Sequence, residues 1–546
     1  VRFSHPPETL IPELKSWPLP ARFSFSGTPR FEKRGFHLHT LHPIELTEQL
    51  HNPDWPNAFE DIREYLDWLA RNGQNSFQFF LLRGIDRKKW PPHAKKIVDY
   101  AHKRGILCGV EISLSMLQQQ AFQAITILRP FPSYTRQVDN TLQWLFIAPW
   151  DFITLEATMG EHLPFLDRLL PDIQSHIEHE VAAGYGAKLM YATHVICPGK
   201  GEKVRRPRLK GSGILVHTVM CYSATEERAP VYGNRNQNFM FEAAKAEKQR
   251  RETWYWPESS YWVGFDTSVP LLLLPYLETR WQDIETMSET GLSGHLTFSS
   301  GWEWGYWLVD WSIARWSWDY RDNRRRIATS PLSGAAAMLG DPVLTDLLAE
   351  ALRIQNHFLK EKELIRYLAA MTPFSELPDP FRRPFQPEPP FRYDWLLTKA
   401  NDGESASVLE GAVRGMEEYS KGMGSLCERF RKRLQLLEKR QAINPKRAAL
   451  ARELVTALEV SALRGRHRGL TIRGLVAKRR EGGLPAAVKI SSEQYLELAR
   501  NTREEAQKLV SGQAGQFRYP AELINSRREG MTAYPFGYLY PATTLH

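Results

Sequence analysis

The sequence has few cysteines, and they form no pattern with a structural role. Four occur among 546 residues, at Cys108, Cys197, Cys221 and Cys427. No pair has CxxC spacing, which excludes a zinc-knuckle motif, and the irregular spacing does not indicate a disulfide framework. One incidental disulfide stays open. We expect no metal and no cofactor.

Nucleotide-binding motifs and long apolar runs are also lacking. No GxGxxG follows the first expected strand, and GxxxxGK[ST] does not occur. The residues therefore give no support to a dinucleotide-binding or P-loop protein. No run approaches the roughly 18 apolar residues of a membrane-spanning helix, so we expect a soluble protein without a transmembrane segment.

Basic residues outnumber acidic residues only in the last third of the chain. The net charge is +9, and residues 351–546 hold 33 Lys and Arg against 22 Asp and Glu, which leaves 38 against 40 for residues 1–350. A basic helical surface could contact phosphates or anionic glycans, but most such surfaces are merely solvated. We expect no specific nucleic-acid partner, and the sequence does not predict an oligomeric state.

The sequence begins with Val rather than Met. This start is consistent with a removed leader or another processing site. We therefore expect a periplasmic or secreted protein, with the cytoplasm as an open alternative.

Short apolar runs alternate with amphipathic stretches between residues 34 and 320, as in repeated βα units. Eight such units match a closed (β/α)8 TIM barrel better than an open doubly wound sheet. The eight expected strands cover residues 34–41, 75–83, 106–114, 151–158, 187–195, 213–222, 253–260 and 292–300.

The sequence changes character after about residue 330. Residues 374–395 are rich in proline and predict an ordered wrapping loop. Beyond them, apolar residues from Leu409 to Leu437 recur at helical spacing, and further helices are expected at about 446–465 and 491–511. We therefore expect three parts: an N-terminal extension (1–33), a barrel domain (34–330) and an all-α C-terminal domain (331–546).

One acid, Glu258, lies within the aromatic stretch TWYWPESSYWVGF at residues 253–265. An unpaired buried carboxylate costs several kcal/mol, so this group must be hydrogen-bonded, protonated or placed at the mouth of a wet pocket. The stretch could be a core strand with one satisfied acid. It could equally line a sugar-binding cleft, where aromatic faces stack on pyranose rings.

Catalytic groups of a TIM barrel come from the carboxyl-terminal ends of its strands. The strand ends of this chain carry acids, histidines and aromatic residues. The catalytic candidates are Glu156 and Glu258, and the substrate-binding candidates are His37, His39, His42, Arg83, Glu111, His194, Tyr222, Tyr255, Trp256, Trp302, Glu303 and Trp304.

This set resembles the (β/α)8 glycoside hydrolases of clan A, in which a general acid/base Glu ends strand four and a nucleophilic Glu ends strand seven. Glu156 in FITLEAT and Glu258 in WYWPESS fall at those places, although Leu155 stands where the clan usually has Asn. The resemblance further implies that Arg83 and Tyr222 hold the nucleophile ionised. A barrel followed by helices is also similar to hexosaminidase-like and alpha-glucuronidase-like proteins.

The resemblance implies cleavage of a glycosidic bond in an oligo- or polysaccharide by two carboxylates. Substrate-assisted hexosaminidases carry adjacent acids at the end of strand four, whereas Glu156 has no acidic neighbour. A retaining enzyme needs its two carboxyls about 5 to 5.5 Å apart, one protonated and one ionised. We therefore expect a two-carboxylate mechanism, with retention favoured over inversion.

Two alternatives stay open. His37, His39, Glu156, His194 and His217 resemble part of the ligand set of metal-dependent amidohydrolases, but strand eight lacks the required Asp, and Asp310 lies in the following helix. The other alternative is a glycan-binding protein on a barrel that has lost catalysis, in which the tryptophans remain useful without paired acids.

Overall fold

A computed structural model of the chain describes residues 25–40, 46–114, 121–126, 129–156, 170–193, 211–229, 235–260, 271–299, 305–322, 324–369, 403–480 and 492–512. Within these ranges the chain forms a closed parallel barrel followed by helices, as the sequence predicts. The expected Pro-rich loop at 374–395 and the start of the N-terminal extension lie outside the described residues. The expected domain boundaries stay predictions.

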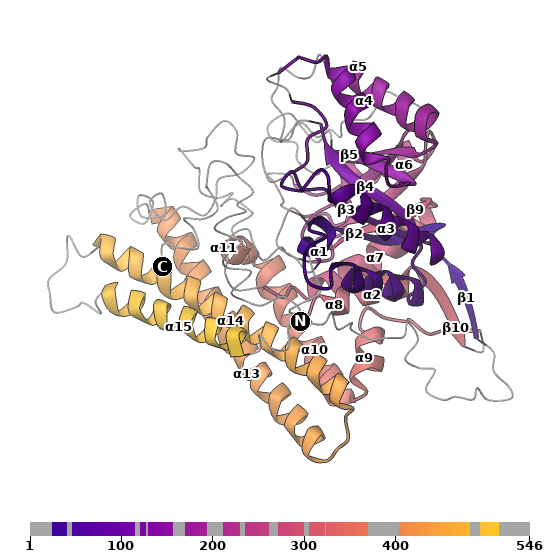
Figure 1. The fold of residues 1–546 in the computed structure, drawn as a ribbon. Helices are drawn as coiled ribbons and strands as arrows, with labels where there is room; N and C mark the ends of the chain where they lie inside the picture. The colour runs from indigo at the N-terminus through magenta and orange to yellow at the C-terminus, as the bar shows by residue number, and fades with distance from the viewer. Residues whose placement is uncertain are drawn as a thin grey trace.

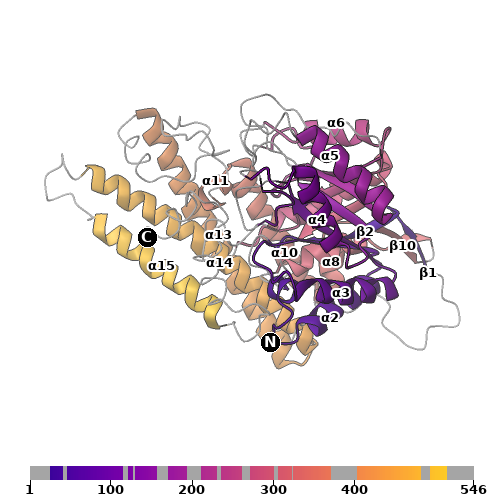
Figure 2. The same cartoon turned by 45° about the horizontal axis from the view of Figure 1, so that its top comes forward.

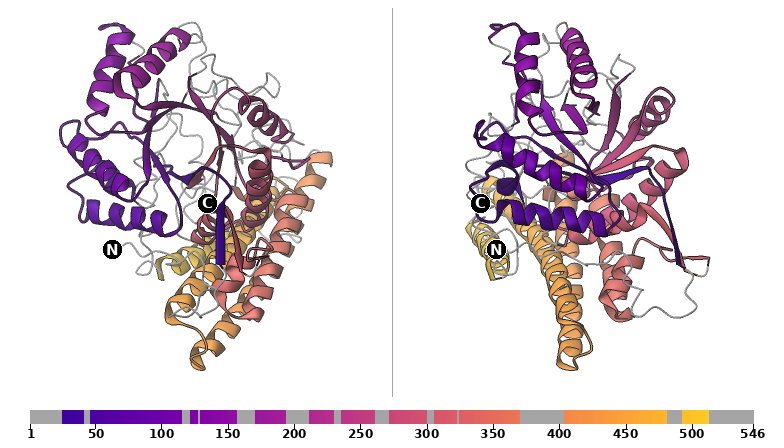
Figure 3. Two further views of the ribbon diagram at one scale, coloured as in Figure 1. Left: turned by 90° about the vertical axis from the view of Figure 1, so that its right-hand side faces the viewer. Right: turned by 45° about the vertical axis from the view of Figure 1, so that its right-hand side comes forward.

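Eight parallel strands close into one barrel (Figure 3). Seven of them lie within the predicted ranges, and the first begins at Lys33, one residue before its predicted range. The last strand pairs with the first, with Phe36 opposite Thr297. The barrel strands are β2 (Lys33–Leu38), β3 (Ser76–Phe80), β4 (Leu107–Ser113), β5 (Phe152–Glu156), β6 (Lys188–Thr193), β7 (Gly213–Thr218), β8 (Thr253–Pro257) and β9 (Gly294–Ser299).

Helices surround the barrel and shield its strands from water (Figure 3). Helix α2, for example, is amphipathic and buries Ile62, Leu66 and Leu69 on one face. Residues 194–210, between β6 and β7, lie outside the described part. The described helices of this layer are α1 (Thr47–His51), α2 (Ala58–Arg71), α3 (Trp90–Lys103), α4 (Tyr134–Leu145), α5 (Leu170–His179) with its π-helical continuation η2 (Glu180–Gly184), α6 (Asn238–Glu247), α7 (Pro275–Thr290) and α8 (Trp307–Trp316).

The barrel interior becomes more polar towards the carboxyl-terminal ends of the strands. Near the opposite end, apolar side chains such as Phe152 and Trp254 fill the space, and Gly109 leaves room for the Phe152 ring, which a Cβ atom would strike. Buried Gln78 and Glu111 lie closer to the carboxyl-terminal ends of β3 and β4. A functional site is therefore expected at the carboxyl-terminal face.

A small antiparallel ribbon lies outside the barrel (Figure 1). Strand β1 (Phe25–Pro29) pairs with β10 (Trp318–Asp322), which continues into β11 (Arg325–Arg326). Trp307 and Trp311 are buried on α8, as their helical spacing predicts. The spacing of seven from Trp311 to Trp318 predicts that Trp318 lies on the same helix face. That prediction is wrong, because α8 ends at Trp316 and Trp318 belongs to β10.

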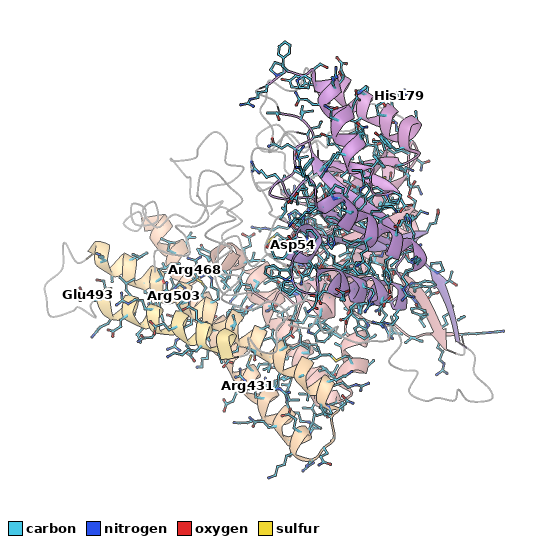
Figure 4. All side chains as sticks on the ribbon, viewed as in Figure 1. Asp54, His179, Arg431, Arg468, Glu493 and Arg503 are labelled. Atoms are coloured by element: carbon cyan, nitrogen blue, oxygen red, sulfur yellow. The ribbon has the colours of Figure 1, made fainter. Side chains whose placement is uncertain are left out.

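The remaining described helices extend to one side of the barrel (Figure 2). Arg431, Arg468 and Arg503 mark this region in Figure 4. Its second long helix runs well past residue 465, where the sequence placed its end. The helices are α9 (Ser333–Leu339), α10 (Pro342–Gln355) with its π-helical continuation η3 (Asn356–Glu361), α11 (Ile365–Ala369), α13 (Gly403–Lys439), α14 (Pro445–Arg480) and α15 (Ser492–Gly512).

The helical region contacts the barrel at the loops that follow β7, β8 and β9. Lys360 of η3 pairs with Glu226 after β7, and Gln355 of α10 accepts a hydrogen bond from the Leu274 backbone N–H after β8. Glu453 of α14 accepts from the Gly305 backbone N–H after β9. Of the described helices, none is both long and apolar enough to cross a membrane.

Candidate active site

The two acids expected to react lie at the carboxyl-terminal face of the barrel. Glu156 is the last residue of β5, although its side chain is outside what the structure describes. Glu258 directly follows β8 and bridges to Phe298 of β9. Its side chain is 17% exposed, so the carboxylate can meet a ligand while much of its surface is enclosed.

Two neighbours hold the Glu258 carboxylate in position. The Met220 backbone N–H donates to Oε2 at 2.7 Å, and His217 Nε2 lies 3.7 Å from Oε1. The Glu258 backbone N–H donates to Thr218 O at 3.1 Å. The segment 217–220, which follows from β7, therefore fixes both ends of the residue.

That segment has an unusual backbone at Met220, whose φ is 59°. Non-glycine residues are uncommon in this left-handed region, and such conformations persist where the surrounding structure enforces them. Here the preceding residue, Val219, is held on both sides by the amide of Gln237, which accepts from Val219 N at 2.9 Å and donates to Val219 O at 3.2 Å. The turn thus aims the Met220 N–H at Glu258.

A buried guanidinium joins this turn to the strand end that carries Glu258. Arg280 of α7 is fully buried, and its Nε donates to Glu258 O at 2.6 Å. Its terminal nitrogens donate to Met220 O and to Tyr222 O. Asp283, three residues on, accepts from Arg280 at 2.6 Å and balances the buried charge.

Tyr255 belongs to the same group of buried polar side chains as Arg280 and Asp283, between the barrel and α7. Its hydroxyl donates to Asp283 and lies 2.8 Å from Thr218 Oγ1, on the side of β8 that faces α7. Burial, and then the charge of Asp283, raises the pKa of Tyr255 well above its usual value. This geometry makes Tyr255 a neutral support for the strand end, enclosed between barrel and helix.

A chain of polar side chains crosses the barrel beneath Glu258. Thr154 Oγ1 donates to Gln78 Oε1 at 2.6 Å, and Gln78 Nε2 donates to Glu111 Oε2 at 3.1 Å. Glu111 Oε2 lies 3.3 Å from His37 Nε2, and the Trp256 indole N–H donates to His37 Nδ1 at 3.0 Å. All five residues are buried, so His37, Glu111 and Trp256 form the floor beneath the site.

The described candidates Arg83, His39 and Tyr222 occupy different positions. Arg83 follows β3 and is exposed, whereas His39 is buried with its ring centroid 3.9 Å from that of Phe298. Tyr222 is buried after β7, with Lys360 of η3 5.3 Å from its ring centroid. Among the described residues, the contacts to the Glu258 carboxylate come from Met220 and His217 rather than from Arg83 or Tyr222.

Several sequence-predicted site residues lie outside the described part of the chain. They follow β2, β6 and β9, where the loops at the carboxyl-terminal face begin. They are His42, His194, Trp302, Glu303 and Trp304.

The contacts of His37 bear on the metal-dependent alternative. A histidine ligand must turn a nitrogen lone pair towards the ion. In His37, Nδ1 accepts from Trp256 and Nε2 faces Glu111, so both nitrogens are engaged by the protein. Within the described ranges, no group of three or more His, Cys, Asp or Glu side chains could hold a metal ion.

The thiols in the described part of the chain are inert. Cys108, Cys221 and Cys427 are buried and free, and Cys197 lies outside the described residues. Burial raises the pKa of Cys221, next to Met220, to about 12. The thiol beside the site therefore stays protonated at neutral pH.

Comparison with known proteins gives distant structural similarity. No family model matches the chain, and no curated protein matches it. Similar solved structures include a GH115 4-O-methyl-alpha-glucuronidase (10% identity, TM-score 0.48, 93% of this chain and 62% of that one) and a GH138 enzyme targeting pectin rhamnogalacturonan II (10%, 0.45, 89% and 77%). An O-GlcNAc hydrolase from Thermobaculum terrenum is 12% identical, with a TM-score of 0.39 over 92% of this chain and 94% of that one.

These structural neighbours are glycoside hydrolases. The chain spans about three fifths of the GH115 enzyme and about three quarters of the GH138 enzyme. At this identity and TM-score the similarity is one of general architecture.

Sequence analysis missed the residues that position Glu258. Met220 and Gln237 act through backbone contacts that no motif reveals, and Arg280 lies in an amphipathic helix where an arginine normally faces water. One signal was available for Arg280. Its spacing of three from Asp283 is suited to an ion pair on one helix face.

Proposed function

We propose that this chain is a glycoside hydrolase that uses two carboxylates, with Glu258 as nucleophile and Glu156 as general acid/base. The observation that carries the proposal is the setting of Glu258. A partly exposed carboxylate, oriented by the Met220 N–H and His217, stands at the carboxyl-terminal face of a closed parallel barrel. That face is where barrel enzymes place their reacting groups.

In the proposed reaction, an ionised Glu258 attacks the anomeric carbon while protonated Glu156 donates its proton to the leaving oxygen. Water then hydrolyses the glycosyl-enzyme ester, with Glu156 acting as base. Glu156 ends β5 and Glu258 follows β8, so both chain positions are at the required face. Retention requires about 5 to 5.5 Å between the two carboxyls, a separation that a ligand-bound crystal structure would measure.

The test replaces Glu258 by Gln, which keeps the side-chain shape and the acceptor for the Met220 N–H. With a panel of 4-nitrophenyl glycosides, we expect turnover to fall at least about 10³-fold, because the amide is a far weaker nucleophile. Azide should restore activity to Glu258→Ala and form a glycosyl azide whose anomeric configuration is opposite to that of the substrate.

Glu252→Gln is the matched control. Glu252 precedes the same strand at the opposite end of the barrel, where it pairs with Lys188, and its replacement should leave turnover within about threefold of wild type. Undiminished turnover in Glu258→Gln would refute the nucleophile assignment. Glycan binding without hydrolysis by the wild type would favour the non-catalytic alternative.

A further inference from the structure

His217 has a fixed proton on one ring nitrogen. Its Nδ1 lies 2.7 Å from the main-chain oxygen of Trp256. A carbonyl oxygen can only accept a hydrogen bond, so Nδ1 must carry hydrogen and donate it. The protonation state of Nε2, the nitrogen nearer to Glu258, then decides the charge of the ring.

The surroundings of His217 determine which protonation state of Nε2 is favoured. Its side chain is 1% exposed, and the rings of Trp256 and Phe298 lie at centroid distances of 4.5 and 5.2 Å. A bare Nε2 lone pair beside an ionised Glu258 oxygen would place two electron-rich atoms together in a site with little water. One proton between them removes that repulsion.

The described charged groups near the pair have partners of their own, whereas the buried Tyr276 hydroxyl makes no hydrogen bond among the described residues. From α7, Arg280 donates to the Glu258 backbone oxygen and pairs with Asp283, and buried Tyr276 lies within the field of Glu258. Across the barrel interior, His37 faces Glu111 and stacks on Trp256. Glu258 Oε1 lies at ion-pair distance from His217 Nε2.

We propose that His217 carries a proton on Nε2 and forms an ion pair with Glu258 across 3.7 Å, which makes His217 a positioning residue that keeps Glu258 ionised. The catalytic consequence of this inference rests on the proposed function. The protonation state of His217 does not depend on it. Transfer of the proton to Glu258 Oε1 would leave a neutral imidazole and a neutral carboxyl, a form of the pair that cannot attack carbon. The reactive form is therefore the imidazolium–carboxylate pair.

The first experiment needs no substrate. In the full chain with 15N-labelled histidine, NMR shifts report whether each ring nitrogen carries hydrogen, and the loss of signals in His217→Gln or His217→Asn assigns the residue. At pH 7 both nitrogens of His217 should appear protonated in wild type. In Glu258→Gln, Nε2 should become a lone-pair nitrogen while Nδ1 stays protonated.

His295 provides an internal reference for a neutral ring. Burial, and then the charge of Arg34, lowers the pKa of His295 to about 3. It should therefore stay neutral from pH 5 to 8 in both proteins. A His217 ring that is neutral in wild type over this range, and unchanged by Glu258→Gln, would overturn the proposal.

The second experiment measures the pH dependence of kcat/KM on an aryl glycoside that the wild type cleaves. If His217 supports Glu258 as proposed, His217→Gln should shift the acid limb of the kcat/KM profile to higher pH than in wild type. His93→Gln is the matched control, because His93 is also buried and bonds a main-chain oxygen, Gln49 O, at 2.7 Å. It should leave the limb in place.

The two experiments separate the two hypotheses. If the NMR result is as expected but Glu258→Gln retains turnover, the imidazolium–carboxylate pair stands and the proposed function fails. If Glu258→Gln is inactive but His217→Gln leaves the acid limb unmoved, the proposed function stands and the role given to His217 fails.

Discussion

At the scale of the residue, the site depends on main-chain atoms as much as on side chains. Arg280 binds the carbonyl oxygens of Met220, Tyr222 and Glu258, so one side chain from α7 spans two strand ends. A guanidinium suits this task because it presents five N–H donors in a rigid plane. The geometry around Glu258 is therefore set from outside the barrel.

Replacing Arg280 by Met should destabilise the protein strongly. The change leaves Asp283 as a buried charge without its partner and removes the donors of three carbonyls, for which we expect a loss of about 3–5 kcal/mol in the free energy of unfolding. Urea denaturation followed by tryptophan fluorescence measures the loss. The double variant Arg280→Met/Asp283→Asn should recover part of it, and a loss below about 1 kcal/mol in the single variant would show that the cluster contributes little.

The sequence could indicate which residue types line the site but not which atoms meet. Strand ends follow from apolar runs, and through them the positions of Glu156 and Glu258 could be predicted. The left-handed turn at Met220 could not, because no glycine or asparagine marks it. The inward or outward orientation of Tyr255 and Trp256 also depends on the register of β8, which a short aromatic run does not fix.

At the scale of the element, the start of α10 combines two functions in one residue. Asp341 caps the helix by accepting from the Leu344 backbone N–H at 2.9 Å. It also accepts from Arg433 of α13, with Arg433 Nη2 2.5 Å from Oδ2. The same carboxylate thus caps the start of one helix and links it to another.

Asp341→Asn should separate these two functions, because asparagine caps about as well as aspartate but carries no charge. Hydrogen bonding to Arg433 lowers the pKa of Asp341. A carboxyl with a lowered folded-state pKa stabilises the fold above its unfolded value of about 3.9, and that stabilisation is lost as the pH falls through the folded value. Asp341→Asn should therefore unfold at a lower temperature than wild type at pH 7, with a difference that shrinks below about pH 4. A difference that is constant between pH 7 and pH 3 would contradict this account.

Element boundaries show where local sequence loses its predictive power. The eight barrel strands lie in the predicted ranges to within one residue because buried parallel strands are short continuous apolar runs between turn residues. Helix α14 runs past its predicted end at residue 465. Residues 466–480 are strongly basic, so their hydrophobic pattern does not indicate a packed helix, and yet α14 buries even Arg468. Contact with neighbouring helices, rather than hydrophobic periodicity, extends it.

At the scale of the whole molecule, the helical region contacts one part of the barrel face through hydrogen bonds and an ion pair. Its contacts go to the loops after β7, β8 and β9, next to Glu258. Gln355 is the buried link to the loop after β8. It donates to Leu272 O at 2.8 Å and accepts from Leu274 N at 2.7 Å.

Gln355→Leu should loosen this link. The substitution keeps a similar volume but leaves the Leu272 carbonyl and the Leu274 N–H without their partner, at about 1–3 kcal/mol for each buried group. Hydrogen-exchange mass spectrometry should show faster exchange at residues 271–274 and little change in α3, on another side of the barrel. Gln355→Glu, which keeps the acceptor for Leu274, should have a smaller effect at that N–H. Equal exchange in wild type and Gln355→Leu would contradict the proposed link.

The ribbon of β1 and β10 has a consequence for the handling of the protein. Strand β1 covers one edge of β10, with Phe25 opposite Asp322 and Pro29 opposite Trp318. Without β1, that edge would present unsatisfied main-chain groups to other molecules, and such open edges promote aggregation. A truncated form intended to stay monomeric in solution should therefore begin before Phe25, even though the barrel proper begins eight residues later.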